Sequence, residues 1–419
     1  MSHEISLIAL LAIGLTLAFL GGFVAVRLRL PVLVGYLLAG VAIGPFTPGF
    51  VGDPHLAQQL AEIGVILLMF GVGMHFAIRD LWAVRRLALP GAIAQIVAAT
   101  AMGDVVAILW GWTFGAGLVF GLALSVASTV VLLKALEARN RLDTSDGRIA
   151  VGWLIVEDLV TVLALVLLPV LAGPLGGQAA GGAGNLWTTL GLTLGKVAAF
   201  IALMLVVGTR LFPWLLKRVE STGARELFTL AVVALALGIA FGSYKLFGVS
   251  FALGAFFAGM VVNESDASHR AEKELKPLED VFAVLFFVAV GMLFDPTVLV
   301  RQPLRVLEVV AIIVVGKSLA AFGIVLVLRS SQRTALTVSA ALAQIGEFSF
   351  ILAALGVGLG LLPLEGQSLI VAGALLSITL NPLVFYGMEK WSSRKRLDDT
   401  PQPSNEVQRD QCHGRAGSR

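Results

Sequence analysis

Long apolar segments follow one another along most of the chain, separated by short polar loops. Thirteen of them have roughly the 20 residues that a helix needs to cross the hydrocarbon core of a bilayer. The pattern predicts an all-α polytopic membrane protein with about 13 transmembrane helices. The predicted spans lie near 5–26, 31–50, 58–77, 88–110, 113–134, 149–171, 187–212, 226–244, 248–263, 280–295, 303–328, 334–360 and 367–389.

Basic residues alternate between the loops on the two sides of these spans. Loops that follow odd-numbered spans carry eighteen Lys and Arg, whereas the opposite loops carry only Lys245, Arg301 and Arg305. Cytoplasmic loops are enriched in Lys and Arg. The alternation therefore predicts an N-terminus outside and a C-terminus in the cytoplasm.

Composition agrees with a membrane protein. Hydrophobic residues make up 58% of the 419 residues and charged residues 14%, where a soluble domain has about a quarter charged. The single cysteine, Cys412, excludes an intrachain disulfide. The sequence contains no zinc-ligand spacing, P-loop or nucleophile elbow, so we expect no enzyme, cofactor or resident metal. The expected partner is the lipid bilayer and not nucleic acid, since the basic residues lie in short loops.

Short segments recur in register along the two halves of the chain. The recurring pairs are Leu67–Phe76 with Leu285–Phe294, Gly35–Gly40 with Gly254–Gly259, and Ala123-Leu124 with Ala341-Leu342, at offsets of 218 or 219. The shift equals seven spans, an odd number, so the two halves must cross the membrane in opposite directions. Such inverted repeats are typical of secondary transporters, with the substrate site near the midplane where the repeats meet.

The repeat divides the chain into segments. We predict a transmembrane domain over 1–389, with repeat one at about 5–171, a linker helix at about 187–212 and repeat two at about 226–389. The polar residues 390–419 are predicted to form a disordered cytoplasmic tail.

Two adjacent carboxylates, Glu157 and Asp158, lie inside the apolar run Val151–Pro169. A charge at the bilayer centre costs about 2.5–3.5 kcal/mol on insertion scales. Asp158 lies about ten residues, or roughly 15 Å, into its span, which places it near the middle of the bilayer. Adjacent helical residues point about 100° apart, so one carboxylate can face an ion cavity and the other a neighbouring helix. Such an acid can bind a proton or a small cation in competition; a structural pair that joins helices is the alternative.

Lys317 supplies a cation at the middle of the span 303–328. It can act in transport, in a permanent structural ion pair, or in both.

Two repeat-related spans have polar centres. One holds Ser128 and Thr129, and the other holds Gln344, Gly346 and Glu347. Hydroxyl groups can coordinate an ion, although they can also bond within an unbroken helix. The matching positions predict two discontinuous helices that cross at the site. Glu347 can neutralise the N-terminus of a half-helix or pair with the lysine.

The chain resembles the monovalent cation:proton antiporter family, in its Kef-type (YbaL-like) branch, over about residues 5–390. The motifs that carry the resemblance are GYLLAGVAIGP (Gly35–Pro45), LSVASTVVLLKALE (Leu124–Glu137), GWLIVEDL (Gly152–Leu159), FFVAVGM (Phe286–Met292), GKSLAA (Gly316–Ala321) and QIGEFSFIL (Gln344–Leu352). The resemblance implies a thirteen-helix inverted-repeat fold, usually dimeric, with a dimerisation domain and a core domain that moves in an elevator-like manner. It also implies a bacterial inner (plasma) membrane location.

The resemblance assigns roles to individual residues. Asp158 matches the core aspartate of the family, Glu157 the residue before it, and Lys317 the membrane lysine. Ser128-Thr129 and Gly346-Glu347 match the two crossing, unwound helices. In total, the predicted ion- and proton-binding residues are Asp158, Glu157, Thr129 and Ser128, and the predicted charge partners are Lys317 and Glu347.

The chain departs from the Kef pattern in two places. Kef proteins have Gln where this chain has Glu157, which can change the stoichiometry or the ion preference. Typical Kef-type chains also continue into a nucleotide-binding regulatory domain, whereas no glycine-rich dinucleotide fingerprint follows Lys390. We therefore expect a membrane domain without that regulatory domain.

The resulting hypothesis is a secondary antiporter that exchanges protons for potassium or, as the second candidate, sodium. A regulated cation channel is the first alternative, although no filter of the TVGYG type occurs in the sequence. A membrane sensor that does not transport ions is the second alternative.

Overall fold

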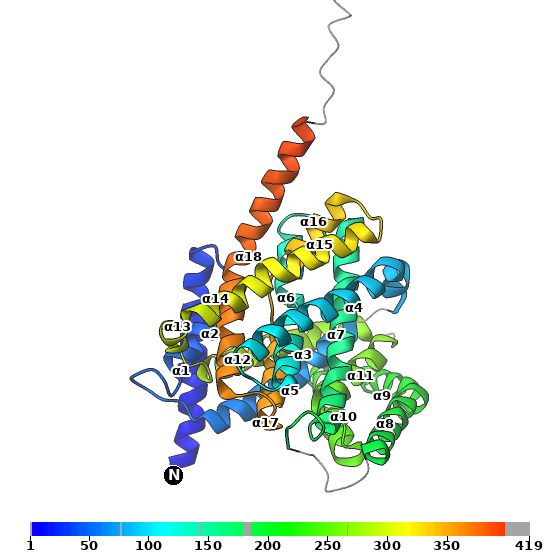
Figure 1. The fold of residues 1–419 in the computed structure, drawn as a ribbon. Coiled ribbons are helices and arrows are strands. Elements are labelled where there is room, and N and C mark those ends of the chain that lie inside the picture. The colour runs from blue at the N-terminus through cyan, green and yellow to red at the C-terminus, as the bar shows by residue number, and fades with distance from the viewer. Residues whose placement is uncertain (1, 76–77, 143, 179–185, 266, 399–419) are drawn as a thin grey trace, which may run out of the picture.

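The computed structural model describes residues 2–75, 78–142, 144–178, 186–265 and 267–398. Within these ranges every regular element is a helix (Figure 1), which confirms the predicted fold class. A cluster of buried apolar side chains runs through the molecule and includes residues from both halves of the chain, from Leu33 to Ile378.

The described ranges contain nine helices that are long and apolar enough to cross a membrane. The bent pair α16 (Gln332–Leu342) and α17 (Glu347–Gly358) makes ten if it counts as one span. Three other predicted spans fall on α2 (Val32–Ala42) and α11 (Phe251–Asn263), which are short, and on α12 (Ser268–Met292), which begins with a charged stretch. Each predicted span thus contains helix, but the count of thirteen is not confirmed.

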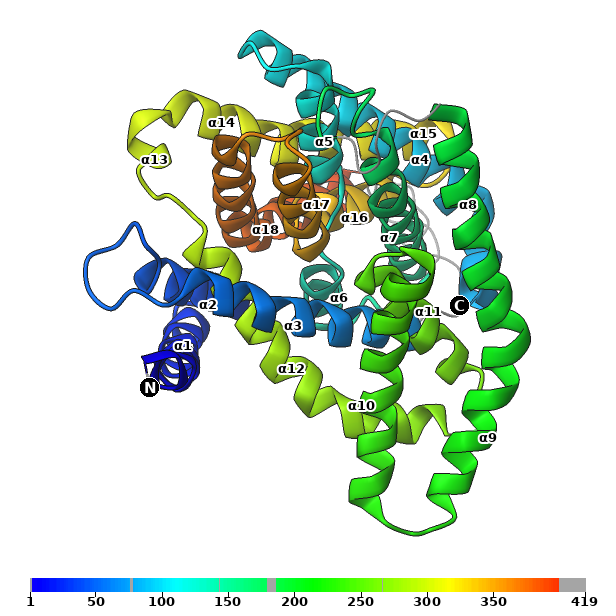
Figure 2. The same ribbon diagram turned by 90° about the horizontal axis from the view of Figure 1, so that it is seen from below.

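One group of helices assembles around α3, which packs along both α11 and α12, while α2 packs against α1 and α12. Figure 2 shows this group in the lower half of the view. Its members are α1 (Ser2–Arg27), α2, α3 (Pro54–His75), α10 (Arg225–Gly242), α11 and α12.

A second group assembles around α4, which packs against α5 and α7, while α18 packs against α14, α16 and α17. These helices lie in the upper half of Figure 2, with α6 near the centre of the view. The members are α4 (Ile78–Leu109), α5 (Phe114–Ser125), α6 (Thr129–Glu137), α7 (Ser145–Leu171), the short α13 (Val298–Arg301), α14 (Pro303–Ala311), α15 (Lys317–Val327), α16, α17 and α18 (Leu364–Asp398).

A long helical segment connects the halves of the chain. It consists of α8 (Leu186–Leu203), the π-helical turn η1 (Met204–Gly208) and α9 (Thr209–Glu220). It covers the predicted linker helix at 187–212 and continues for two further turns. Two other π-helical turns, η2 (Ser243–Phe247) and η3 (Ile312–Gly316), follow α10 and α14.

The end of α18 differs from the predicted domain boundary at 389. The helix continues to Asp398 and projects beyond the other helices in Figure 1. The first nine residues of the predicted tail are therefore helical, and residues 399–419 lie outside the described ranges.

Glycines allow helices of the first group to touch through their backbones. A Cβ on Gly40 of α2 would lie 2.0 Å from the carbonyl oxygen of Val288, and one on Gly291 of α12 would lie 2.1 Å from that of Leu37. α3 and α11 are in the same kind of contact. A Cβ on Gly73 of α3 would lie 2.1 Å from the carbonyl oxygen of Phe256, and one on Gly259 of α11 would lie 2.0 Å from that of Phe70. Such close approach between membrane helices requires small residues.

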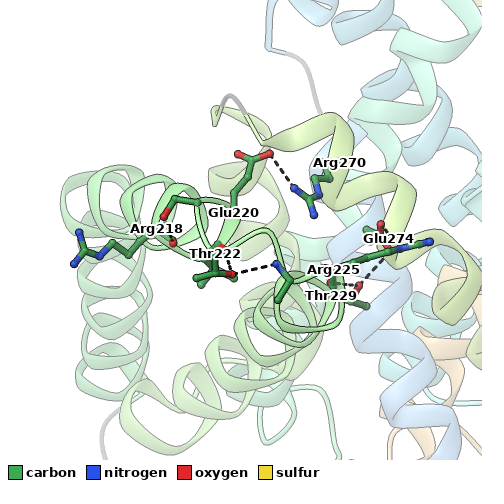
Figure 3. A network of polar contacts seen from close by, with 10 residues as sticks. Arg218, Glu220, Thr222, Arg225, Thr229, Arg270 and Glu274 are labelled. Atoms are coloured by element: carbon green, nitrogen blue, oxygen red, sulfur yellow. Dashed lines mark hydrogen bonds and ion pairs between the residues drawn. The ribbon is translucent and has the colours of Figure 1, made fainter.

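A cluster of polar contacts, here called the polar clasp, fastens the turn between α9 and α10 to α12 (Figure 3). The Nε of Arg225 donates to both carboxylate oxygens of Glu274, at 2.8 and 3.0 Å. The hydroxyl of Thr229 donates to Glu274 at 3.2 Å, and Arg270 donates to Glu220 at 3.2 Å. The polar clasp thus connects the turn between α9 and α10 to α12 of the first group.

Candidate functional site

The helical segment that starts at Phe114 is broken near its middle, as predicted. α5 ends at Ser125, Val126 and Ser128 are extended, and α6 starts at Thr129. The hydroxyl oxygen of Ser128 accepts from the main-chain N–H of Val131 at 3.3 Å and so caps α6. The break exposes peptide groups that an unbroken helix would use internally.

A second break separates α16 from α17, whose axes differ by 49°. The two breaks meet, because a Cβ built on Gly346 would lie only 2.2 Å from the Cβ of Ser128. Only a residue without a side chain permits this contact. The predicted crossing of two discontinuous helices is therefore present, and it lies at Ser128 and Gly346.

Polar groups join the two breaks. The side-chain amide of Gln344 accepts from the main-chain N–H of Ser128 at 3.0 Å and donates to the main-chain oxygen of Ser128 at 3.1 Å. The hydroxyl of Ser128 donates to Oε2 of Glu347 at 2.9 Å. Glu347 is the first residue of α17, so its carboxylate lies at a helix N-terminus, where negative charge is favoured.

α7 brings Glu157 and Asp158 to the start of α6. The hydroxyl of Thr129 donates to Oδ2 of Asp158 at 3.1 Å, and the main-chain N–H of Ala127 donates to Oε2 of Glu157 at 2.8 Å. Asp158 is 5% exposed and Glu157 is fully buried. The two adjacent carboxylates thus take separate partners at the break between α5 and α6, next to α7.

Lys317 begins α15, directly after the π-helical turn η3. Its Nζ is fully buried and donates to the main-chain oxygen of Gln344 at 3.2 Å. Electrostatic attraction also links it to the carboxylate of Glu157. Two roles were predicted for Glu347: to neutralise a half-helix N-terminus or to pair with Lys317. The structure shows Glu347 at a half-helix N-terminus, and the hydrogen bond of Lys317 goes to Gln344 instead.

Each of the three carboxylates keeps one buried oxygen without a hydrogen-bond partner among the described residues: Oε1 of Glu157, Oδ1 of Asp158 and Oε1 of Glu347. Repulsion from Glu347 and Glu157 acts on Asp158. Burying a carboxylate is costly unless it is paired, protonated or bound to a cation. A proton or a metal cation on these oxygens would reduce that cost, and the two would compete.

Two buried amides at the breaks were not among the predicted site residues. Gln344 joins the two breaks, and Gln95 of α4 donates to the main-chain oxygen of Ser125 at 3.1 Å, at the end of α5. Trp153 of α7 in turn donates to the Oε1 of Gln95 at 3.4 Å. The sequence analysis placed Gln344 at the polar centre of its span without giving it a role. The signal that could have found Gln95 is an amide within an apolar span, since a buried amide needs partners.

The architecture defines a class: a polytopic helical membrane protein in which two broken helices cross beside buried carboxylates, as in secondary transporters. Residues 15–387 match the family described as "Sodium/hydrogen exchanger, transmembrane". The chain belongs to this family.

Individual relatives support the assignment. YbaL of Escherichia coli (strain K12), which is named provisionally as a cation/proton antiporter, is 57% identical over 431 aligned positions that cover 100% of this chain and 77% of YbaL. K(+) efflux antiporter 4 of Arabidopsis thaliana is 34% identical, over 91% of this chain and 64% of its own length.

Among solved structures, the sodium proton antiporter MjNhaP1 of Methanocaldococcus jannaschii has the same fold. The TM-score is 0.64, and the match covers 93% of this chain and 99% of that protein. At 17% sequence identity, the comparison concerns the fold alone.

Proposed function

We propose that the protein is a secondary active antiporter that exchanges a monovalent cation for protons at Asp158. The observation that carries the proposal is the buried Oδ1 of Asp158, which has no hydrogen-bond partner among the described residues and lies where two broken helices cross. The family of the chain and the names of its relatives support the same activity.

Competition at one carboxylate explains exchange without a further coupling device. When Asp158 is ionised, its oxygens and the hydroxyl of Thr129 offer ligands for a cation. When it is protonated, the negative charge that attracts the cation is gone. Glu157 shares or tunes the site, Lys317 supplies the counter-charge, and Glu347 and Ser128 hold the second broken helix in place.

We propose potassium as the exchanged cation, with sodium as the second candidate. One observation favours potassium: the Arabidopsis relative, which matches 91% of this chain, is named as a K(+) efflux antiporter. The family description, which names sodium, keeps the second candidate open.

We also propose an inverted repeat and alternating access between the two helix groups. Ser128 and Gly346, the residues that meet at the crossing, are 218 positions apart, which is the offset of the sequence repeat. The reciprocal glycine contacts support the repeat as well. Gly40 corresponds to Gly259, and Gly73 to Gly291, at offsets of 219 and 218.

The proposed setting is a bacterial inner membrane, with the N-terminus outside, the C-terminus in the cytoplasm and two copies forming a homodimer. The distribution of Lys and Arg supports the orientation. In this orientation the polar clasp lies on the cytoplasmic side.

Proton flux in sealed proteoliposomes with a pH-sensitive dye tests the activity. K⁺, Na⁺ or Li⁺ is added in turn, first with the membrane potential clamped and then with a potential imposed. Proton movement on addition of K⁺ that does not respond to potential is the result expected for electroneutral exchange. A response to potential would mean that unequal charge is exchanged.

The same assay separates the two alternatives. A channel would conduct cations without moving protons and would not saturate at low rates. A sensor would move neither ion, while a known antiporter reconstituted in parallel remains active. Either result would overturn the proposal.

A further inference from the structure

Gln344 occupies the break between α16 and α17 and is fully buried. Its amide pairs with the main chain of Ser128 in both directions, as acceptor for the N–H at 3.0 Å and as donor to the oxygen at 3.1 Å. Two peptide groups pair in this reciprocal way between strands of a β-sheet. The side chain of Gln344 thus takes the place of a neighbouring peptide for a residue that has left its helix.

The main chain of Gln344 contacts Lys317, the positively charged side chain of the site. Its carbonyl oxygen accepts from Nζ of Lys317 at 3.2 Å. One residue therefore contacts Lys317 with its backbone and Ser128 with its side chain. Gln344 therefore lies between the lysine and the start of α6 and contacts both.

Ser128 in turn fixes the groups that face the carboxylates. Its hydroxyl caps α6 and donates to Glu347 at 2.9 Å. The next residue, Thr129, donates to Asp158 at 3.1 Å. A continuous series of contacts leads from Lys317 through Gln344, Ser128 and Thr129 to Asp158.

We propose that Gln344 is a positioning residue of the exchange site, whose amide holds the Thr129 hydroxyl against Asp158 and sets the distance from Lys317 to the acids. This inference rests on the proposed function. A cation bound between oxygen ligands is sensitive to their positions, so the loss of this amide reduces cation affinity more than it reduces the maximal rate.

Two substitutions of Gln344 distinguish positioning from simple packing. Gln344→Leu removes both hydrogen bonds to Ser128. Gln344→Glu retains an acceptor for the N–H, but it carries a donor for the carbonyl oxygen only while it is protonated. The matched control is Asn381→Leu on α18, another buried amide, which donates to the main-chain oxygen of Ala340 at 2.9 Å near the end of α16.

The half-saturating K⁺ concentration and the maximal rate are measured in sealed proteoliposomes over a series of pH values. We expect Gln344→Leu to raise the half-saturating concentration at least tenfold with a smaller change in maximal rate. Asn381→Leu leaves the half-saturating concentration unchanged. The half-saturating concentration of Gln344→Glu, divided by that of wild type, decreases as the pH falls, whereas the corresponding ratio for Gln344→Leu stays constant.

The inference is overturned if Gln344→Leu folds, exchanges ions and has the same half-saturating K⁺ concentration as the wild type. If Gln344→Leu does not yield a monodisperse protein, Gln344→Glu tests the inference alone. A ratio of its half-saturating concentration to that of wild type that does not change with pH overturns the inference. Absence of cation-driven proton flux from the wild type would instead reject the proposed function on which the inference rests.

Discussion

Ser128 and Gly346 face each other so closely that a Cβ on Gly346 would lie 2.2 Å from the Cβ of Ser128. The contact joins two backbone breaks at the level of the buried carboxylates. It places Glu347 within hydrogen-bond distance of Ser128, at 2.9 Å, and keeps both half-helices next to Asp158. The arrangement makes the crossing sensitive to substitutions that add volume.

Gly346→Ala should impair exchange at least tenfold and lower the melting temperature, because the added methyl group overlaps the Cβ of Ser128. Proteoliposome flux and thermal unfolding in detergent measure the two effects. The control is Gly358→Ala at the end of the same helix, where a Cβ meets nothing within 4 Å in the described structure. Equal activity of the two variants would contradict a tight crossing.

Asp158→Asn should abolish exchange while the protein still folds. The amide cannot bind and release a proton as the acid does, and its shape preserves the hydrogen bond from Thr129. Cation-dependent proton flux and size-exclusion chromatography test the two statements. Asp280→Asn, a change at an exposed carboxylate on α12, serves as a control that retains exchange. Exchange at a normal rate in Asp158→Asn would refute the site assignment.

Lys317→Met should reduce the free energy of unfolding by about 1.5–3 kcal/mol, because the charged hydrogen bond to the oxygen of Gln344 is lost inside the protein. It also leaves Glu157 without the cation that attracts it. The double variant with Glu157→Gln should recover part of this loss, since both charges are then absent. Strictly additive effects in chemical denaturation would show that the two groups do not interact.

The polar clasp should contribute less stability as the pH falls. Hydrogen bonds from Arg225 hold the pKa of Glu274 below its usual value. A carboxylate whose pKa is lower in the folded state stabilises the fold above its unfolded pKa, and this contribution is lost as the pH falls through the folded pKa.

The measurement for the clasp compares melting temperatures of wild type and Glu274→Gln from neutral to acidic pH. Wild type should be more stable at neutral pH, and the difference should shrink toward acid. Glu226→Gln, next to Arg225 on the exposed surface of α10, is the control for removing a neighbouring surface charge. A difference that grows as the pH falls would contradict the assignment.

Much of the site could be predicted because each element leaves a local signal. Glu157 and Asp158 stand out in the apolar run of α7, and the glycine and hydroxyl residues at the two breaks interrupt otherwise apolar helices. The partners could not be predicted. Whether Glu347 pairs with Lys317 or with Ser128 depends on distances between helices that are far apart in the sequence.

The sequence by itself determined the helical membrane class and the approximate positions of the helices, because bilayer thickness imposes a length of about 20 apolar residues on each span. The sequence did not determine the number of spans, since α2 and α11 are short and are supported by neighbouring helices through glycine contacts. Only the tertiary structure decided that Gln344 pairs with Ser128 and that both acids of α7 bond to residues at the break between α5 and α6. Those contacts follow from the crossing of two breaks, and hydropathy along one chain carries no information about which breaks meet.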